Sequence, residues 1–147
     1  MKAKILILTL ILTALAACKK DLYTTAPQLK FLSVNADVFP QNSILQFKIQ
    51  VTDKEGDIQD TFWVQQISIN ACADTLTQPY QVPDFAATKD LKGEFDITYA
   101  YGDVQGYPFI TGCSLKNDSC YFRFWLKDKA NHISDTISSS PIVLLNQ

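Results

Sequence analysis

"SILQFKIQV", residues 43–51, is the stretch of sequence that decides the fold. Its apolar residues stand at every second position from Leu45 to Val51, and polar residues fill the positions between them. Successive side chains of a β-strand point to opposite faces of a sheet. This period of two therefore predicts a strand with one buried face and one face in water.

Similar runs of β-branched and aromatic residues recur along the chain, separated by turn-rich segments. They cover residues 29–34, 61–71, 93–101, 120–127 and 135–145. Pro141 indicates an edge strand or a bulge in the last run, because proline cannot donate to a sheet ladder. Six or seven short strands without a helical repeat predict an all-β fold, an antiparallel sandwich.

The N-terminus reads as a lipoprotein leader. Lys2 and Lys4 precede an apolar run, residues 5–17, which has the length of a signal-peptide core but is too short to span a bilayer. The residues that follow, Leu15-Ala16-Ala17-Cys18, resemble the lipobox of bacterial lipoproteins. This resemblance implies that Cys18 is acylated and that the leader is cut before it. The alternative is an ordinary cleaved signal with a chance cysteine.

These features divide the chain into a signal peptide (1–17), a lipidated cysteine with a tether (18–28) and a sandwich domain (29–147). The formal net charge is −2, and no run of Lys or Arg occurs, so nucleic acid is not an expected partner. We expect the protein to be anchored in the bacterial outer membrane through its lipid. Whether it faces the periplasm or the cell surface stays open at this point.

Three longer stretches carry a family resemblance to uncharacterised lipoproteins of the Bacteroidota type that contain an immunoglobulin-like domain. They are "FKIQVTDKEGDIQD" (47–60), "PYQVPDFAATKDLKGEFDI" (79–97) and "FRFWLKDKANHISDTISSSPIVLL" (122–145). The resemblance implies an immunoglobulin-like sandwich of about seven strands. The chain departs from the usual Gly-Asn at Asn131-His132, and it lacks the strand-B cysteine of antibody domains.

The sequence favours a non-enzymatic binding or structural module. His132 is the single histidine, and no nucleophile, phosphate-binding or zinc motif occurs. Tyr121, Arg123 and Trp125 share the outer face of their strand, where aromatic side chains could bind a glycan or an envelope protein. The alternative for this face is that residues 102–119 cover it. The alternative function is a small envelope enzyme, or an enzyme inhibitor, acting on glycan or peptide.

Acidic residues gather around Gly56. Asp53, Glu55, Asp57 and Asp60 lie within eight residues, and the turn containing Asp128 is expected at the same end of a sandwich, with Asp135 also a candidate. Ca²⁺ binds several carboxylate oxygens, so these residues form a hypothetical Ca²⁺ site that pins the two turns near the tether. The alternative is a solvated acidic turn.

Cysteines and Asp-Thr pairs suggest covalent modification. An oxidising compartment predicts one disulfide among the remaining cysteines, either Cys113–Cys120 or a bond from Cys72 to one of these two. Thr75 and Thr136 each follow an aspartate and precede an apolar residue, which resembles an O-glycosylation acceptor of this bacterial group. The alternative is that Asp-Thr simply favours turns.

Overall fold

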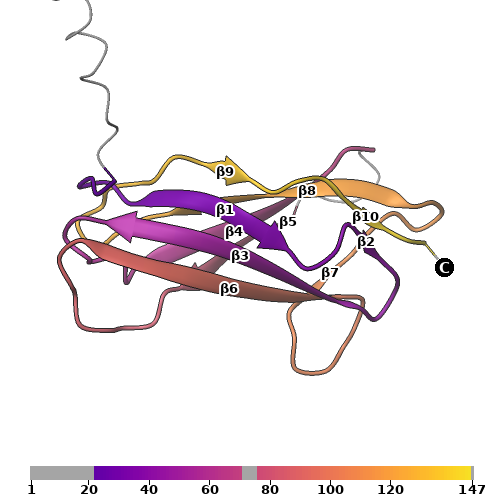
Figure 1. The fold of residues 1–147 in the computed structure, drawn as a ribbon. Helices are drawn as coiled ribbons and strands as arrows, with labels where there is room; N and C mark the ends of the chain where they lie inside the picture. The colour runs from indigo at the N-terminus through magenta and orange to yellow at the C-terminus, as the bar shows by residue number, and fades with distance from the viewer. Residues whose placement is uncertain (1–21, 71–75, 147) are drawn as a thin grey trace, which may run out of the picture.

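The computed structural model describes residues 22–70 and 76–146, which form two β-sheets packed face to face (Figure 1). The first sheet has the strand order β1 (Gln28–Val34), β3 (Ile44–Asp53), β6 (Leu91–Tyr101) and β7 (Phe109–Ile110). The second has the order β2 (Val38–Phe39), β10 (Ile142–Leu144), β8 (Asp118–Leu126), β4 (Thr61–Ser68) and β5 (Leu76–Gln81), and β9 (Ile137–Ser138) also pairs with β8. The predicted all-β, immunoglobulin-like sandwich is confirmed.

The sheets are mixed, which corrects the expectation of purely antiparallel pairing. The long strands pair antiparallel, but β2 runs parallel to β10, and β7 runs parallel to β6. Both parallel pairs involve strands of two residues at sheet edges. The run at 135–145 is divided into β9 and β10, with Pro141 between them. No described segment forms a helix that could cross a membrane.

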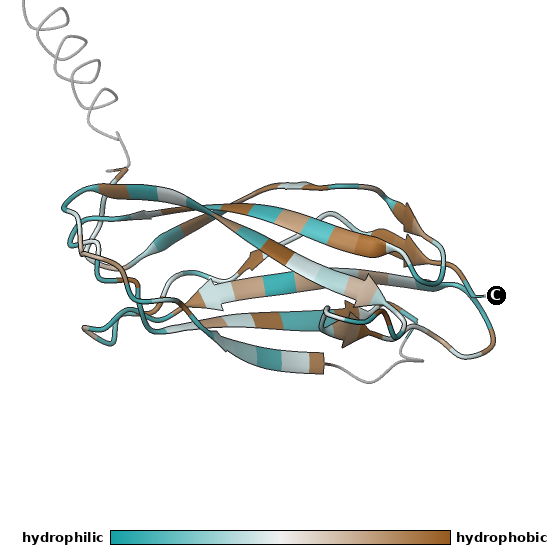
Figure 2. Ribbon diagram, turned by 90° about the horizontal axis from the view of Figure 1, so that it is seen from below, coloured by the Kyte–Doolittle hydropathy of each residue, from teal (hydrophilic) through white to brown (hydrophobic). Residues whose placement is uncertain are grey.

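Phenylalanine rings fill the space between the sheets. Alternate residues of β3 and β8 point inward, and Figure 2 shows the resulting change between hydrophobic and hydrophilic positions along the strands. The ring centroids of Phe47 and Phe122 are 4.7 Å apart, and those of Phe62 and Phe95 are 4.9 Å apart. Burying one such side chain contributes about 1.5–3 kcal/mol, so this cluster contributes strongly to stability.

Several chain segments meet at the end of the sandwich where β3 and β8 finish. The backbone N–H of Lys54 donates to the carbonyl of Thr24 at 3.1 Å, which places the start of the described chain beside the end of β3. The N–H of Lys129 donates to the carbonyl of Asp57 at 2.9 Å. The turn after β3 and the turn after β8 therefore touch, as predicted. The indigo start of the ribbon lies at the same end of the sandwich (Figure 1).

Candidate functional site

The acidic turn after β3 is built around Gly56. Its φ is +73°, a left-handed conformation that glycine adopts without strain. A Cβ at this position would lie 2.2 Å from the carbonyl oxygen of Thr88. The N–H of Gly56 donates to Asp53 Oδ1 at 2.5 Å. Asp53 is the last residue of β3 and is fully buried, so the turn folds back over its side chain.

Three of the six candidate metal ligands come together. We call Asp53, Asp57 and Asp128 the acidic cluster, because each offers a carboxylate oxygen and these oxygens lie within 4.8 Å of one another. Asp128 is also fully buried. It accepts a hydrogen bond from the N–H of His132 at 2.8 Å, and its Oδ2 lies 2.9 Å from His132 Nδ1.

The other acidic candidates lie outside the cluster. Glu55 is exposed, as is Asp135. Asp60 pairs with Lys127 at 3.2 Å, and the hydroxyl of Thr61 donates to it at 2.7 Å. The Thr61 hydrogen bond, helped by Lys127, lowers the pKa of Asp60 below its ordinary value. Asp60 therefore holds the base of β4 to the turn after β8.

Burial dominates the electrostatics of Asp53. Desolvation raises the pKa of Asp53, and the nearby charges of Asp57 and Glu55 raise it further. The backbone N–H groups of Gly56 and Asp57 act in the opposite direction, because they donate to the carboxylate. A buried carboxyl group next to other carboxyl groups is unfavourable unless a further group compensates it.

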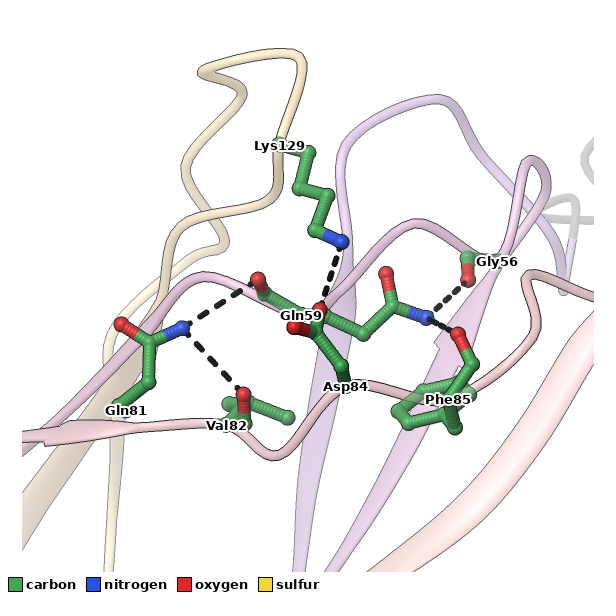
Figure 3. A network of polar contacts seen from close by, with 7 residues as sticks. All are labelled: Gly56, Gln59, Gln81, Val82, Asp84, Phe85 and Lys129. Carbon is green, nitrogen blue, oxygen red and sulfur yellow. Dashed lines mark hydrogen bonds and ion pairs between the residues drawn. The ribbon is translucent and has the colours of Figure 1, made fainter.

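A network of glutamine side chains fastens a neighbouring loop to the acidic turn (Figure 3). The amide nitrogen of Gln59 donates to the carbonyls of Gly56 at 3.1 Å and Phe85 at 3.2 Å. Gln81 donates to the carbonyl of Gln59 at 3.4 Å. Sequence reasoning missed Gln59, which is 3% exposed. The position of Gln59 between Asp57 and Asp60 was the feature of the sequence that could have indicated a role in this turn.

The candidate binding face is the outer surface of the β5-β4-β8 part of its sheet. Trp63 lies directly opposite Trp125, with ring centroids 5.9 Å apart and planes 5° from parallel. Gln65 lies opposite Arg123, and their side chains are joined by a hydrogen bond of 3.5 Å. We call the six outward residues the aromatic face; they are Trp63, Gln65, Ile67, Tyr121, Arg123 and Trp125.

This face is partly open to solvent. Arg123 is exposed, and Tyr121 and Trp125 are partly exposed. The segment expected as a cover, residues 102–119, contains β7, which pairs with β6 in the opposite sheet. That pairing directs the segment away from the aromatic face. Tyr80 lies in β5, and its hydroxyl accepts a hydrogen bond of 2.7 Å from Tyr99.

The serine and acid near His132 do not form a nucleophilic arrangement with it. Ser134 Oγ donates to the carbonyl of Asp135 at 2.9 Å and accepts from the N–H of Leu126 at 3.0 Å. The hydroxyl is therefore committed to backbone groups, and the contact of His132 is to Asp128.

An apolar pocket of about 270 Å³ opens between β5 and β6. Phe62, Tyr80, Phe95 and Ile97 contribute to its lining. Asp96 is the carboxylate that lines it, and this residue pairs with Lys48 at 3.1 Å. The described residues that line this pocket supply one carboxyl group, whereas glycoside hydrolysis uses a pair.

The cysteines correct one prediction. Cys120 is a free thiol, 0% exposed, because it occupies an inward position of β8. The predicted bonds Cys113–Cys120 and Cys72–Cys120 are therefore wrong. Cys113 is not a free thiol. Cys18, Cys72 and Thr75 lie outside the described residues, and Thr136 is exposed just before β9.

Comparisons with known proteins give structural similarities of low identity. No family model matches the chain, and no curated protein matches it. The sporulation control protein Spo0M from Bacillus subtilis is similar over 84% of this chain, with 11% identity and a TM-score of 0.48, and the match spans 51% of that protein. A Niemann-Pick type C2 protein from the Japanese carpenter ant is similar over 85% of this chain and 97% of its own, with 9% identity and a TM-score of 0.44. At these scores neither similarity indicates what this chain binds.

Proposed function

We propose that this protein is a lipid-anchored, non-enzymatic module of the bacterial outer membrane that binds a glycan on its aromatic face. The anchor is Cys18, on the evidence of the lipobox-like residues that end at it. Two or three acyl chains hold a protein on a membrane almost permanently, at about 0.8 kcal/mol for each buried methylene. Intact-mass measurement of the membrane fraction tests this part, and a Cys18→Ala protein that still partitions wholly into detergent would contradict it.

The observation that carries the proposed binding activity is the order of side chains across the aromatic face. The stacked pair Trp63–Trp125 forms one aromatic rung across β4 and β8, and Ile67–Tyr121 forms an apolar rung four residue pairs further along. Between them lies a polar rung, in which Gln65 also donates to Thr77 at 3.1 Å. Hydrogen-bonding groups therefore stand between two apolar platforms.

This order matches the chemistry of a sugar chain. A sugar ring offers an apolar C–H face to an aromatic side chain and hydroxyl groups around its edge. Aromatic side chains with a polar neighbour are typical of binding surfaces. The guanidinium of Arg123 supplies several donors in a fixed plane, and the amide of Gln65 supplies both donors and an acceptor. A glycan is therefore the ligand class that could contact both the apolar pairs and the polar pair of the face.

Native affinity electrophoresis tests the proposal. The full chain in detergent is run through gels that contain xylan, mannan, β-glucan or solubilised peptidoglycan. We expect one of these polymers to retard the protein, and we expect Trp125→Ala to abolish most of the retardation. Tyr107→Ala is the matched control, since Tyr107 is an aromatic residue 46% exposed that lies outside the face.

Two results would contradict glycan binding. One is normal migration of the wild-type protein in all four polymers. The other is equal loss of retardation in the Trp125→Ala and Tyr107→Ala proteins, which would place the contact elsewhere.

We also propose a disulfide between Cys72 and Cys113. It is the predicted pairing that does not use the free Cys120. Cys113 is 4% exposed and sits in the segment between β7 and β8. Peptide mapping without reduction should recover the linked peptides of Cys72 and Cys113 and an unlinked peptide of Cys120. Recovery of Cys72 as an unlinked thiol would remove the proposal.

A further inference from the structure

The acidic cluster joins the two sheets at one end of the sandwich. Asp53 ends β3 in the first sheet, and Asp128 follows β8 in the second. Asp57 lies in the turn between β3 and β4, and one of its carboxylate oxygens lies within 4.8 Å of an oxygen of each of the other two. Asp53 and Asp57 are four positions apart, whereas Asp128 is 75 positions from Asp53, so the fold brings the carboxylate of Asp128 to the other two.

Two oxygens of the cluster lack a hydrogen-bond partner among the described residues. They are Asp53 Oδ2 and Asp57 Oδ1, and both atoms are buried. The whole Asp53 side chain is inaccessible to solvent. A buried carboxylate oxygen without a donor is costly, and the cost grows when a second carboxylate faces it. A positively charged group between these oxygens would offset this cost.

Three nearby basic side chains are engaged elsewhere. Lys127 pairs with Asp60 at 3.2 Å, and Lys129 pairs with Asp84 at 2.8 Å. His132 contacts Asp128, the member of the cluster whose oxygens already have partners. None of these groups approaches the two unpartnered oxygens by hydrogen bond or ion pair. The compensating charge is not supplied by these side chains.

We propose that Asp53, Asp57 and Asp128 bind one Ca²⁺ ion. Ca²⁺ takes oxygen ligands at about 2.3–2.6 Å, so opposite ligands on its shell are about 4.6–5.2 Å apart. The cluster oxygens, all within 4.8 Å of one another, fit on one such shell. Mg²⁺ requires a tighter shell of about 4.2 Å across and near-octahedral geometry. The donor set is all oxygen, which does not favour Zn²⁺.

Hydrogen bonds around the cluster orient the proposed ligands. Gly56 N–H donates to Oδ1 of Asp53, the oxygen that already has a partner, and His132 N–H donates to Oδ1 of Asp128. Such bonds fix the rotation of a carboxylate without using all of its lone pairs. Carbonyl oxygens or water would complete the six to eight ligands that Ca²⁺ takes.

The bound ion would clamp the end of the domain at which the chain enters. Lys54, next to Asp53, holds Thr24 through a backbone hydrogen bond of 3.1 Å. Gln28, the first residue of β1, donates to the hydroxyl of Thr24 at 2.7 Å. The ion would therefore stabilise the junction between the tether and both sheets. This inference does not depend on glycan binding by the aromatic face.

Thermal unfolding of the full chain in detergent tests the proposal, with millimolar Ca²⁺, millimolar Mg²⁺ or chelator. A ligand that binds only the folded state raises Tm by mass action, and for a domain of this size we expect a rise of about 5 °C or more in Ca²⁺. Mg²⁺ should give a clearly smaller rise. Titration calorimetry with CaCl₂ should give one site per chain.

Two variants separate metal binding from a purely structural role. Asp57→Asn should lose most of the rise in Ca²⁺, yet in chelator it should be at least as stable as the wild type, because one repelling charge is gone. Glu55→Gln is the matched control: it removes the same charge from the same turn but lies outside the cluster, so it should keep the rise.

Three outcomes would overturn the proposal. The first is an identical Tm in Ca²⁺ and chelator, which would leave a proton shared between Asp53 and Asp57 as the compensating group. The second is an equal rise in Mg²⁺ and Ca²⁺, which would remove the assignment to Ca²⁺. The third is an equal loss of the rise in Asp57→Asn and Glu55→Gln, which would mean a diffuse charge effect.

Discussion

Gly56 is the residue on which the acidic turn depends. Its positive φ suits glycine, and the space where a side chain would stand is filled by the backbone of Thr88. The carbonyl of Gly56 is also an acceptor for Gln59, which links the turn to the loop at Phe85 (Figure 3). A side chain at this position would therefore disturb the turn, the loop and the cluster together.

We expect Gly56→Ala to lower the free energy of unfolding by about 3 kcal/mol or more, because a backbone clash adds to the strain of a positive φ. Urea unfolding followed by circular dichroism measures the loss. Gly106→Ala is the control, since Gly106 has a φ of +90° but no atom within 4 Å of an added Cβ. That change should cost only about 1 kcal/mol. Equal losses for the two variants would show that contact with Thr88 is unimportant.

At the scale of elements, the strength of the period-two pattern determined which strands the sequence could predict. The runs at 43–51, 93–101 and 120–127 match β3, β6 and β8, whose inward residues form the core. β5 was missed because it is an edge strand of mostly polar residues with a proline at position 79. β2 and β7 have two residues each, too few to carry a period.

The contacts of the candidate sites also differ in whether the sequence could predict them. The meeting of Asp57 and Asp128 followed from the general rule that these two turns share an end of the sandwich. The contact of Trp63 with Trp125 depends on the register of β4 against β8, which nothing in either strand specifies alone. The burial of Gln59 depends on a loop that reaches it from 26 residues away.

β8 supplies the centre of the core, and its inward rings should dominate stability. Phe122 is fully buried and contacts Phe47, Phe124 and Tyr99. We expect Phe122→Ala to cost about 3–5 kcal/mol, from lost transfer energy and the cavity left behind. Phe109→Ala, in β7 and 54% exposed, should cost less than about 1 kcal/mol. Chemical denaturation measures both, and a comparable loss for the two would place the centre of the core elsewhere.

On the scale of the whole molecule, the two proposed sites lie on different parts of the sandwich. The aromatic face covers the outside of the β4-β8 pairing, whereas the acidic cluster lies at the end where β3 and β8 finish. An ion that fastens this end would leave the face free for a ligand. The core between them contains hydroxyl and thiol groups that must stay protonated, and this sets an upper pH limit for the fold.

Two buried groups, the Cys120 thiol and the Tyr99 hydroxyl, set that limit. Burial raises the pKa of the Cys120 thiol to about 12, and the charge of Asp118 adds to the effect. Burial likewise raises the pKa of Tyr99, helped by its hydrogen bond to Tyr80. In the unfolded chain the pKa of the cysteine thiol is about 8.5, and that of the tyrosine hydroxyl is about 10. The folded state therefore holds protons that the unfolded state releases, so stability is complete below about pH 8.5 and falls as the pH rises toward 12. Each group should remove about 1.4 kcal/mol per pH unit above its unfolded pKa.

Urea midpoints measured from pH 7.5 to 11 should show the decline. In Cys120→Ala, which lacks the thiol, the decline should begin more than one pH unit later, where tyrosine ionises. A wild-type midpoint that stays constant up to pH 11 would mean that these groups ionise in the folded protein as readily as in the unfolded chain.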